Sequence, residues 1–333
     1  QLLHRLPGLK VPRVLVVGLG VERKFDAGRY LQATRAAARV LKTTAAADAV
    51  PFPRGNHWRA TRGDEVITII GTYHFDDPRH AATMTAITPS LTAASTVLVE
   101  AGPEEEKALL DLMASDPGRM MIMDGPTLLE RLPPDTWDRL SAALAARGVP
   151  SFMAAKLQPW SVAVMLAFPP CAMAEMTDPT GLDGMVIDAA LAAGIPIRAL
   201  EPFDTVFTLF DTMSEDEVVA MIDSTLAMED RAEDYSATLA DSYFAGTSRM
   251  IWEYMRDESR NLPGYTPERI EAEFARMEEL LRAARNRAWI PVLTEAAAKG
   301  PVFAAFGALH LSGKDGVLNL LAAEGFKLEE LPL

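Results

Sequence analysis

The chain has 333 residues, of which 49% are hydrophobic and 23% are charged, a balance typical of a globular protein with a sizeable core. Its formal net charge of −14 argues against a surface that binds nucleic acid or anionic membranes, because phosphate contacts need clustered Lys and Arg. No apolar run approaches the ~20 residues of a membrane-spanning helix. Nothing in the sequence indicates an oligomeric state.

Cysteine and histidine are scarce. The single cysteine, Cys171, excludes an internal disulfide and a zinc site made of cysteines. A metal would therefore have to be bound by His, Asp and Glu, and the chain has five histidines: His4, His57, His74, His80 and His310.

Residues 1–45 are expected to form a separate βα extension. A β-rich run at 13–17 ends in a Gly-Leu-Gly turn, and an Ala-rich helix is expected at 27–42. Arg23 stands where a dinucleotide-binding loop has its third glycine, so an ordinary βα turn is favoured over a nucleotide site. A proline-containing linker follows, and the main domain is placed at 46–333.

Four apolar runs in this domain are typical of buried strands, and each is followed by a histidine or a glutamate. Two runs end in Gly-x-x-His, which carries His74 and His310. The other two are followed by Glu100 and Glu201. Ligand-binding groups gather where the strands of α/β proteins give way to loops. Pairing His74 with Glu100, and His310 with Glu201, predicts two related half-units that share one sheet.

Most other segments have helical patterns. Thr266 and Pro267 begin an amphipathic helix that is expected to end near Arg285 and Asn286, and a second helix is expected from Trp289. Other helices are expected at about 81–94, from 104, at 126–147, 159–166 and 181–193, from 214 and from 317. We therefore predict a helix-rich α/β fold with a central, mostly parallel or mixed sheet and a helical insertion at about 206–290.

If the strands are neighbours in a parallel sheet, His74, Glu100 and His310 converge at one edge. Two imidazoles and a carboxylate make a suitable ligand set for Zn²⁺, Mn²⁺ or Co²⁺. The alternative for each histidine is a partly buried, hydrogen-bonded residue that caps a loop. His80 and Asp76 lie close to His74 in sequence. They could join the metal ligands, but they are expected to be surface residues on the loop.

Several other residues have two interpretations. Arg285 and Asn286 by themselves indicate a solvated helix end rather than a clamp on an oxyanion or carboxylate. Residues 156–160 either line a pocket or start a helix with Trp160. Glu201 either orients a ligand or caps the next helix. The methionine-rich stretches are interpreted as core filler: Met120, Met121 and Met123, and Met213, Met221 and Met228.

Residues 46–333 resemble the TraB/GumN family, which includes the TIKI metalloproteases and is distantly similar to erythromycin esterases. The resemblance lies in these segments, in family order: IIGTYHFDDPRH, VLVEAGPEE, KLQPWSVAVML, GLDGMVIDAALAAGIPIRALEPFDT, RNRAWIPVL and FGALHLSGKDGVLNLLAAEGF. Residues 1–45 resemble the N-terminal region of leucyl aminopeptidases, without that family's catalytic domain.

The resemblance implies roles for five residues. It assigns His74 and His310 to the family's proposed active site, Glu100 to the glutamate after the second core strand, and Arg285 and Asn286 to its Arg-Asn pair. It thus replaces the interpretation of that pair as a solvated helix end. In the TIKI branch this set is thought to support metal-dependent proteolysis, whereas the esterase branch uses a His general base without a metal. A further relative is a haem-binding lipoprotein, so the fold alone does not decide the chemistry.

The leading hypothesis is a metal-dependent hydrolase, a peptidase, in which His74, Glu100 and His310 hold a divalent metal that activates water. Arg285 and Asn286 would hold the substrate or the oxyanion. The alternatives are a metal-independent esterase and a protein that binds haem or another small ligand. The substrate is expected to be a peptide or a small molecule. A periplasmic or exported location is expected if residues before Gln1 held a signal peptide, and a cytoplasmic one otherwise.

Overall fold

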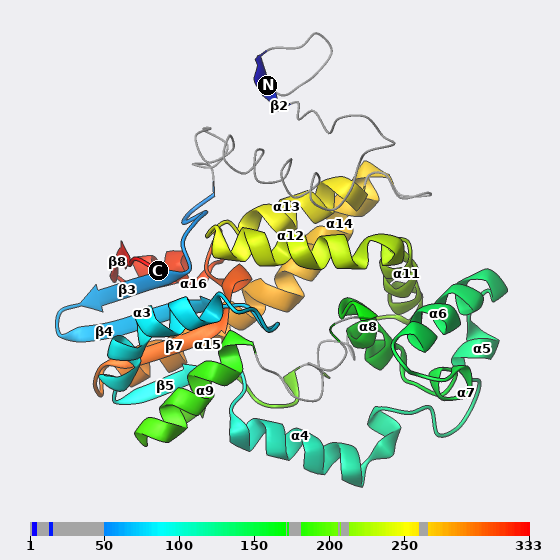
Figure 1. Ribbon diagram of the computed structural model, residues 1–333, viewed down its shortest axis with the longest axis horizontal. Coiled ribbons are helices and arrows are strands. Elements are labelled where there is room, and N and C mark those ends of the chain that lie inside the picture. The colour runs from blue at the N-terminus through cyan, green and yellow to red at the C-terminus, as the bar shows by residue number, and fades with distance from the viewer. Residues whose placement is uncertain are drawn as a thin grey trace.

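The computed structural model describes residues 2–4, 13–15, 50–170, 172, 181–205, 207, 213–259 and 266–333. At its centre is a six-stranded mixed sheet with the strand order β6-β5-β7-β4-β3-β8 (Figure 1). The strands are β3 (His57–Arg62), β4 (Glu65–Thr72), β5 (Thr96–Val99), β6 (Ile197–Ala199), β7 (Val302–Gly307) and β8 (Lys327–Glu330). The predicted helix-rich α/β fold with a mixed sheet is confirmed.

Four strands, β4, β5, β6 and β7, are parallel, whereas β3 pairs antiparallel with both β4 and β8. The hairpin strand β3 was not predicted, because its sequence mixes polar and apolar residues without a clear run.

The strands of the two predicted half-units alternate in the sheet. β4 and β5 lie on either side of β7, and β6 and β7 lie on either side of β5. All four parallel strands therefore bring their carboxyl ends to the same edge.

The side chains of β7 show how the sheet is covered on both faces, because successive residues of a strand point to opposite sides. Phe303 and Ala305 pack with helices α3 (His80–Thr92) and α9 (Leu182–Ala193). Ala304 and Phe306 pack with α15 (Ala284–Ala297) and α16 (Val317–Ala323) on the other face. All six residues of β7 are buried, as expected for a central parallel strand.

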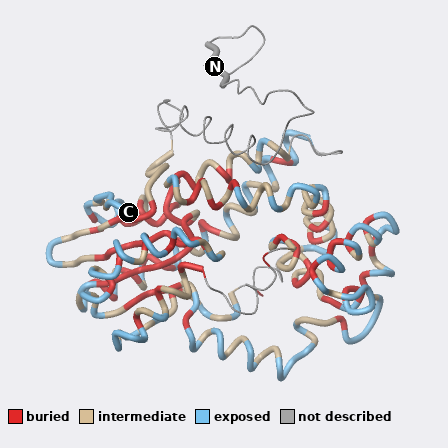
Figure 2. Tube along the Cα trace, viewed as in Figure 1, coloured by how far each residue is buried: buried red, intermediate tan, exposed pale blue. Residues whose placement is uncertain are grey.

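A second hydrophobic core lies in a group of helices beside the sheet, here called the helical unit (Figures 1 and 2). It consists of α5 (Leu128–Arg131), α6 (Pro134–Ala146), α7 (Ser151–Ala154), α8 (Pro159–Ala167) and α11 (Glu215–Leu226). Leu140, Val162 and Ile222 are fully buried in this core. It connects to the sheet through α4 (Pro103–Ser115) and η2 (Pro117–Arg119).

The predicted helical insertion continues through α12 (Ala232–Phe244), preceded by η4 (Glu229–Arg231), and α13 (Arg249–Glu258). It then enters one uninterrupted helical segment that consists of α14 (Pro267–Glu278), the π-helical η6 (Glu279–Ala283) and α15. The predicted helix end near Arg285 and Asn286 is therefore wrong. A π turn inserts an extra residue, so the apolar pattern changes phase there without the helix ending.

The N-terminal region is described at β1 (Leu2–His4) and β2 (Arg13–Leu15), which pair antiparallel. β2 lies within the strand predicted at 13–17, while the helix expected at 27–42 and Cys171 lie outside the described residues. The domain boundary at residue 45 stays a prediction. Within the described ranges, every helix is too short or too polar to cross a membrane.

Candidate active site

The two Gly-x-x-His motifs lie side by side, because β4 and β7 are neighbours and Thr72 pairs with Gly307. His74 follows β4 by two residues, and His310 ends the short η7 turn (Ala308–His310) after β7. A Cβ atom at Gly307 would lie 3.4 Å from Nε2 of His74, 3.3 Å from Oε1 of Glu100 and 3.7 Å from Cδ2 of His310. The three predicted metal ligands thus surround one point next to Gly307.

Gly71, which begins the Gly-x-x-His motif of His74, is required for a different reason. A Cβ at Gly71 would lie 2.5 Å from Cδ1 of Leu311 and 2.9 Å from Cα of Ala308. Only a residue without a side chain allows β4 to approach the turn after β7 this closely. The glycine at 71 therefore brings the two motifs together, whereas the glycine at 307 leaves space between the polar groups.

His310 is buried, with 6% of its surface exposed. Its Nδ1 lies 2.5 Å from the Oδ1 of Asn286, which can only accept a hydrogen bond, so Nδ1 carries the proton and Nε2 presents a lone pair. Nη1 of Arg285 lies 3.3 Å from that Nε2. The ring also packs on Trp289, at a centroid distance of 4.4 Å. Burial, with the Arg285 charge beside it, lowers the pKa of His310 to about 3 despite the opposing charge of Glu100.

His74 has a different environment. Its side chain is 59% exposed, and its Nδ1 lies 2.7 Å from the Oδ2 of Asp183. The other oxygen of Asp183 accepts a hydrogen bond of 2.6 Å from the hydroxyl of Thr72. The negative charge of Asp183 is the main reason that the pKa of His74 is raised to about 9, although burial acts in the opposite direction. With Nδ1 held by Asp183, the Nε2 atom faces Gly307 and the other two groups.

Asp183 reaches His74 because the start of α9 lies directly against the Gly-x-x-His loop. The backbone N–H of Leu182 donates to the carbonyl of Tyr73 at 3.1 Å. A Cβ at Gly181 would lie 2.1 Å from the carbonyl oxygen of His74, so the contact requires glycine. Sequence reasoning missed Asp183. The sequence feature that could have indicated it is the Gly-Leu-Asp at the start of α9. Without this contact, those three residues are typical of any helix start.

Glu100 and Glu201 follow the adjacent strands β5 and β6, and Arg285 joins them. Nη2 of Arg285 lies 2.5 Å from Glu100 and 2.7 Å from Glu201, and its Nε donates to Glu201 at 2.8 Å. Glu201 also accepts from the indole N–H of Trp289 at 3.0 Å, so it holds Arg285 and Trp289 in place, and its role toward a ligand stays a prediction.

Glu100 is held ionised by its neighbours. Its Oε1 accepts the backbone N–H of Gly307 at 2.7 Å. Burial opposes its ionisation, but the nearby His310 and Arg285 outweigh burial and lower the pKa of Glu100 to about 2. The carboxylate therefore stays charged at neutral pH.

The Arg-Asn pair lies just after the π-helical η6, in the middle of a helix rather than at its end. Such π turns occur often at functional sites. Arg285 faces the two glutamates, while the neighbouring Asn286 is completely buried. The amide of Asn286 donates to the carbonyls of His310 and Asp315, at 3.2 Å and 2.8 Å. The pair therefore fixes Glu100 and His310 at the same time.

Other residues that the sequence singled out lie elsewhere. His80 is buried, at 1% exposure, and its Nε2 bonds the carbonyl of Phe75, so its predicted surface position is wrong; Asp76 is exposed as expected. His80 is buried because it packs among the aromatic rings of Tyr73, Tyr243 and Phe244. Trp160 starts α8 and packs on Phe207, while Gln158 lines a pocket, so both interpretations of 156–160 hold.

Comparison with known proteins identifies two parts of the chain. The model of the TraB/PrgY/gumN family matches residues 56–330, and that of the cytosol aminopeptidase N-terminal domain matches residues 1–65. The chain is 60% identical over 43 residues to a probable cytosol aminopeptidase of Xanthomonas campestris pv. campestris (strain B100), which covers 13% of this chain and 9% of that protein.

A probable cytosol aminopeptidase of Methylobacillus flagellatus is 42% identical over 82 residues, which cover 22% of this chain and 16% of that protein. The chain thus spans less than a fifth of the length of the curated relatives it matches. No solved structure matches the chain significantly.

Proposed function

The chain belongs to the TraB/PrgY/gumN family, and from that premise we propose that it is a hydrolase of peptide bonds whose centre is the cluster of His74, Glu100, His310 and Arg285. The observation that carries the proposal is the convergence of three side chains, those of His74, Glu100 and His310, within 3.7 Å of one point beside Gly307. The similarity of the N-terminal segment to aminopeptidases favours a peptide substrate only weakly, because it is short.

The donor set fits a divalent metal ion in its chemistry. Both histidines have Nδ1 held by an oxygen of a neighbouring side chain, which is the usual support for a metal-binding imidazole and leaves Nε2 as the ligand. Glu100, Glu201 and Asp183 outnumber the one arginine, so the cluster favours an added cation. Within the described ranges, no three His, Cys, Asp or Glu side chains are placed so that they could hold a metal ion as they stand, so binding requires these side chains to move. For a metal to bind the Nε2 of His310, the guanidinium of Arg285 would have to move away from that atom.

We assign the residues the following parts. His74, Glu100 and His310 would hold Mn²⁺, Co²⁺ or Zn²⁺, which supplies a water of lowered pKa and polarises a carbonyl. Arg285, steadied by Glu201, offers a fixed positive charge to a developing oxyanion. Asn286 keeps the proton of His310 on Nδ1. His74 is the most exposed of the three ligands, so it borders the side from which substrate enters.

Metal content tests the proposal directly. Protein purified without chelator should contain about one equivalent of a divalent metal by mass spectrometry of the elements, and His310→Ala and His74→Ala should lose it. Asp64→Asn is the matched control, because this residue lies in the turn before β4, at the opposite end of the strand. A wild type without stoichiometric metal after incubation with Mn²⁺, Co²⁺ or Zn²⁺, or a His310→Ala variant that keeps it, would exclude this use of the cluster.

A second candidate is hydrolysis without a metal, and the position of Arg285 favours it. The guanidinium already contacts both Glu100 and the Nε2 of His310, where a metal would bind. In this case the lone pair on the Nε2 of His310 would accept a proton as general base. Turnover of a small ester that survives exhaustive EDTA treatment and is lost in His310→Gln would support this candidate. Loss of turnover on EDTA treatment, restored by Mn²⁺, would exclude it.

A further inference from the structure

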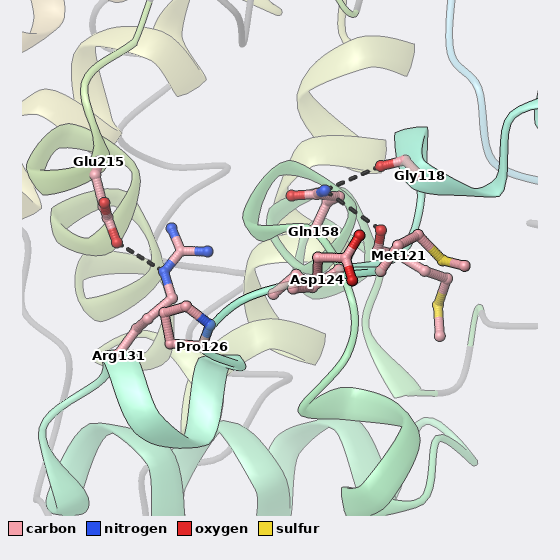
Figure 3. Close-up of a pocket in the computed structure, with 9 residues that line it drawn as sticks. Gly118, Met121, Asp124, Pro126, Arg131, Gln158 and Glu215 are labelled. Atoms are coloured by element: carbon pink, nitrogen blue, oxygen red, sulfur yellow. Dashed lines mark hydrogen bonds and ion pairs between the residues drawn. The ribbon is translucent and has the colours of Figure 1, made fainter.

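A pocket of about 500 Å³ opens in the helical unit (Figure 3). Its lining includes Met121, Met123, Asp124, Arg131 and Gln158. Met123 is 62% exposed, so its interpretation as core filler is wrong, whereas Met121 is half-buried and packs against the helical core as well as lining the pocket.

The backbone explains why both thioethers reach the pocket. Met121 forms an antiparallel bridge with Leu157, and the N–H of Ile122 donates to the carbonyl of Lys156 at 2.6 Å, so the segment is extended there. In an extended segment, residues two apart point to the same side. Ile122, between them, is buried in the helical core with 7% exposure, and its part of the chain also borders the pocket. Met121 and Met123 therefore share the side that faces the pocket.

The pocket wall is held in place by hydrogen bonds. The side-chain amide of Gln158 donates to the carbonyl of Gly118 at 2.9 Å, with a longer contact of 3.4 Å to that of Met121 (Figure 3). On the opposite wall, Nε of Arg131 donates to Glu215 at 2.7 Å. This ion pair neutralises the arginine. Asp124 forms no ion pair with any residue that the structure describes, so it leaves the pocket one negative charge.

We propose that this pocket binds a soft monovalent cation, Cu⁺, through the sulfur atoms of Met121 and Met123, with Asp124 supplying the neutralising charge. Thioethers are soft ligands that select Cu⁺ over Zn²⁺, Mg²⁺ or Ca²⁺, which prefer nitrogen or oxygen. Thioethers also do not take up protons near neutral pH. Binding at this pocket is therefore independent of pH between 5 and 8, unlike binding to histidines. The proposal does not depend on the proposed hydrolase activity.

Silver is the probe, because Ag⁺ has the same preference for sulfur and needs no reductant. All samples carry Cys171→Ser, since a thiolate would compete for Ag⁺. The protein is labelled with ¹³C at its methionine methyl groups, and Ag⁺ is titrated in chloride-free buffer at pH 5.5 and 7.5. We expect two of the 16 methionine signals to shift together, with saturation near one equivalent at both pH values. Met121→Leu and Met123→Leu assign these signals.

Variants separate a sulfur site from an apolar one. Met121→Leu/Met123→Leu keeps the size and apolar character of both side chains and should abolish the one-equivalent saturation, detected also by calorimetry. The control is Met153→Leu, which removes a methionine of 43% exposure outside the pocket and should leave binding unchanged. Equal shifts at all exposed methionines, no shift at the two pocket signals, or a double variant that binds Ag⁺ as wild type does would overturn the proposal.

Discussion

His74 and His310 end the same motif on adjacent parallel strands, yet their surroundings are opposite. His310 is 6% exposed, and burial lowers its pKa to about 3. The His74 side chain is 59% exposed, and Asp183 raises its pKa to about 9. At neutral pH the His310 ring is therefore neutral, and the His74 ring is positively charged unless a bound metal displaces its second proton.

The difference comes from residues outside the motif. An uncharged amide, Asn286, holds Nδ1 of His310, whereas a carboxylate, Asp183, holds Nδ1 of His74. Two copies of one motif can thus supply one proton acceptor, His310, and one proton donor, His74, to the same site. Four substitution experiments test this contrast.

The largest effect is expected from Asn286→Leu. Leucine has a similar size but leaves the carbonyls of His310 and Asp315 and the Nδ1–H of His310 without buried partners. Each buried group left without a partner costs about 1–3 kcal/mol, so the three groups together should lower the free energy of unfolding by at least about 3 kcal/mol. Urea unfolding followed by circular dichroism measures it. Asn319→Ala, at an exposed bond, is the control, and equal losses in both variants would contradict the prediction.

The two motif glycines should respond differently to alanine. Gly71→Ala places a Cβ 2.9 Å from the backbone of Ala308 and should lower the free energy of unfolding by about 2–3 kcal/mol through overpacking. Gly307→Ala meets its neighbours at 3.3 Å or more and should cost less than about 1 kcal/mol. Because that methyl group fills the space between His74 and Glu100, the variant should fold and lose metal or turnover. A fully active Gly307→Ala protein would show that this space is not used.

Acid should destabilise the protein partly through His310. Its pKa is about 3 in the folded chain, below its ordinary 6.5, so under pH 6.5 the unfolded chain binds a proton that the folded chain does not. Stability therefore falls as the pH falls from 6.5 toward 3, by up to about 1.4 kcal/mol per pH unit. Glu100 adds a further loss of stability only when the pH falls below 4.5, its ordinary pKa, toward its pKa of about 2 in the folded chain.

The upper part of this pH range, from 6.5 to 5.5, reports mainly on the histidines. His310→Asn should lose part of the slope of unfolding free energy against pH there. His57, whose pKa is also lowered by burial, contributes to the remaining slope. An unchanged slope in His310→Asn would show that the folded state accommodates the charged ring.

The smallest effect on stability is expected from Asp183→Asn. Water screens the exposed His74, so the loss should be below about 1 kcal/mol. This loss of stability should be fully present below pH 6.5 and should vanish as the pH rises through about 9. The reason is that the raised pKa of His74 stabilises the folded state only while the ring is protonated. NMR titration of the His74 ring should show its pKa falling toward 6.5. Thr72→Val, which removes the other bond to Asp183, should cause a smaller fall.

The sequence predicted the strand ends well, because each of these strands is a short apolar run that stops sharply at a Gly-x-x-His or a Glu. It also predicted the mixed sheet and the long helical stretch. The position of Arg285 and Asn286 within a helix could not be predicted, since a π turn depends on hydrogen bonds that leave no pattern of residues. Asp183 was missed because its partner is more than a hundred positions away, and the contact through Gly181 is visible only in the folded chain.

The central strand β7 comes from the last tenth of the chain, although its neighbours β4 and β5 are complete by residue 99. During synthesis the two early strands have to wait for some 200 further residues before the strand between them leaves the ribosome. Contacts of this sequence separation slow folding. Until then the edges of β4 and β5 that β7 will cover expose unpaired backbone groups to other chains. A chain truncated before residue 302 should therefore aggregate rather than form a smaller sheet.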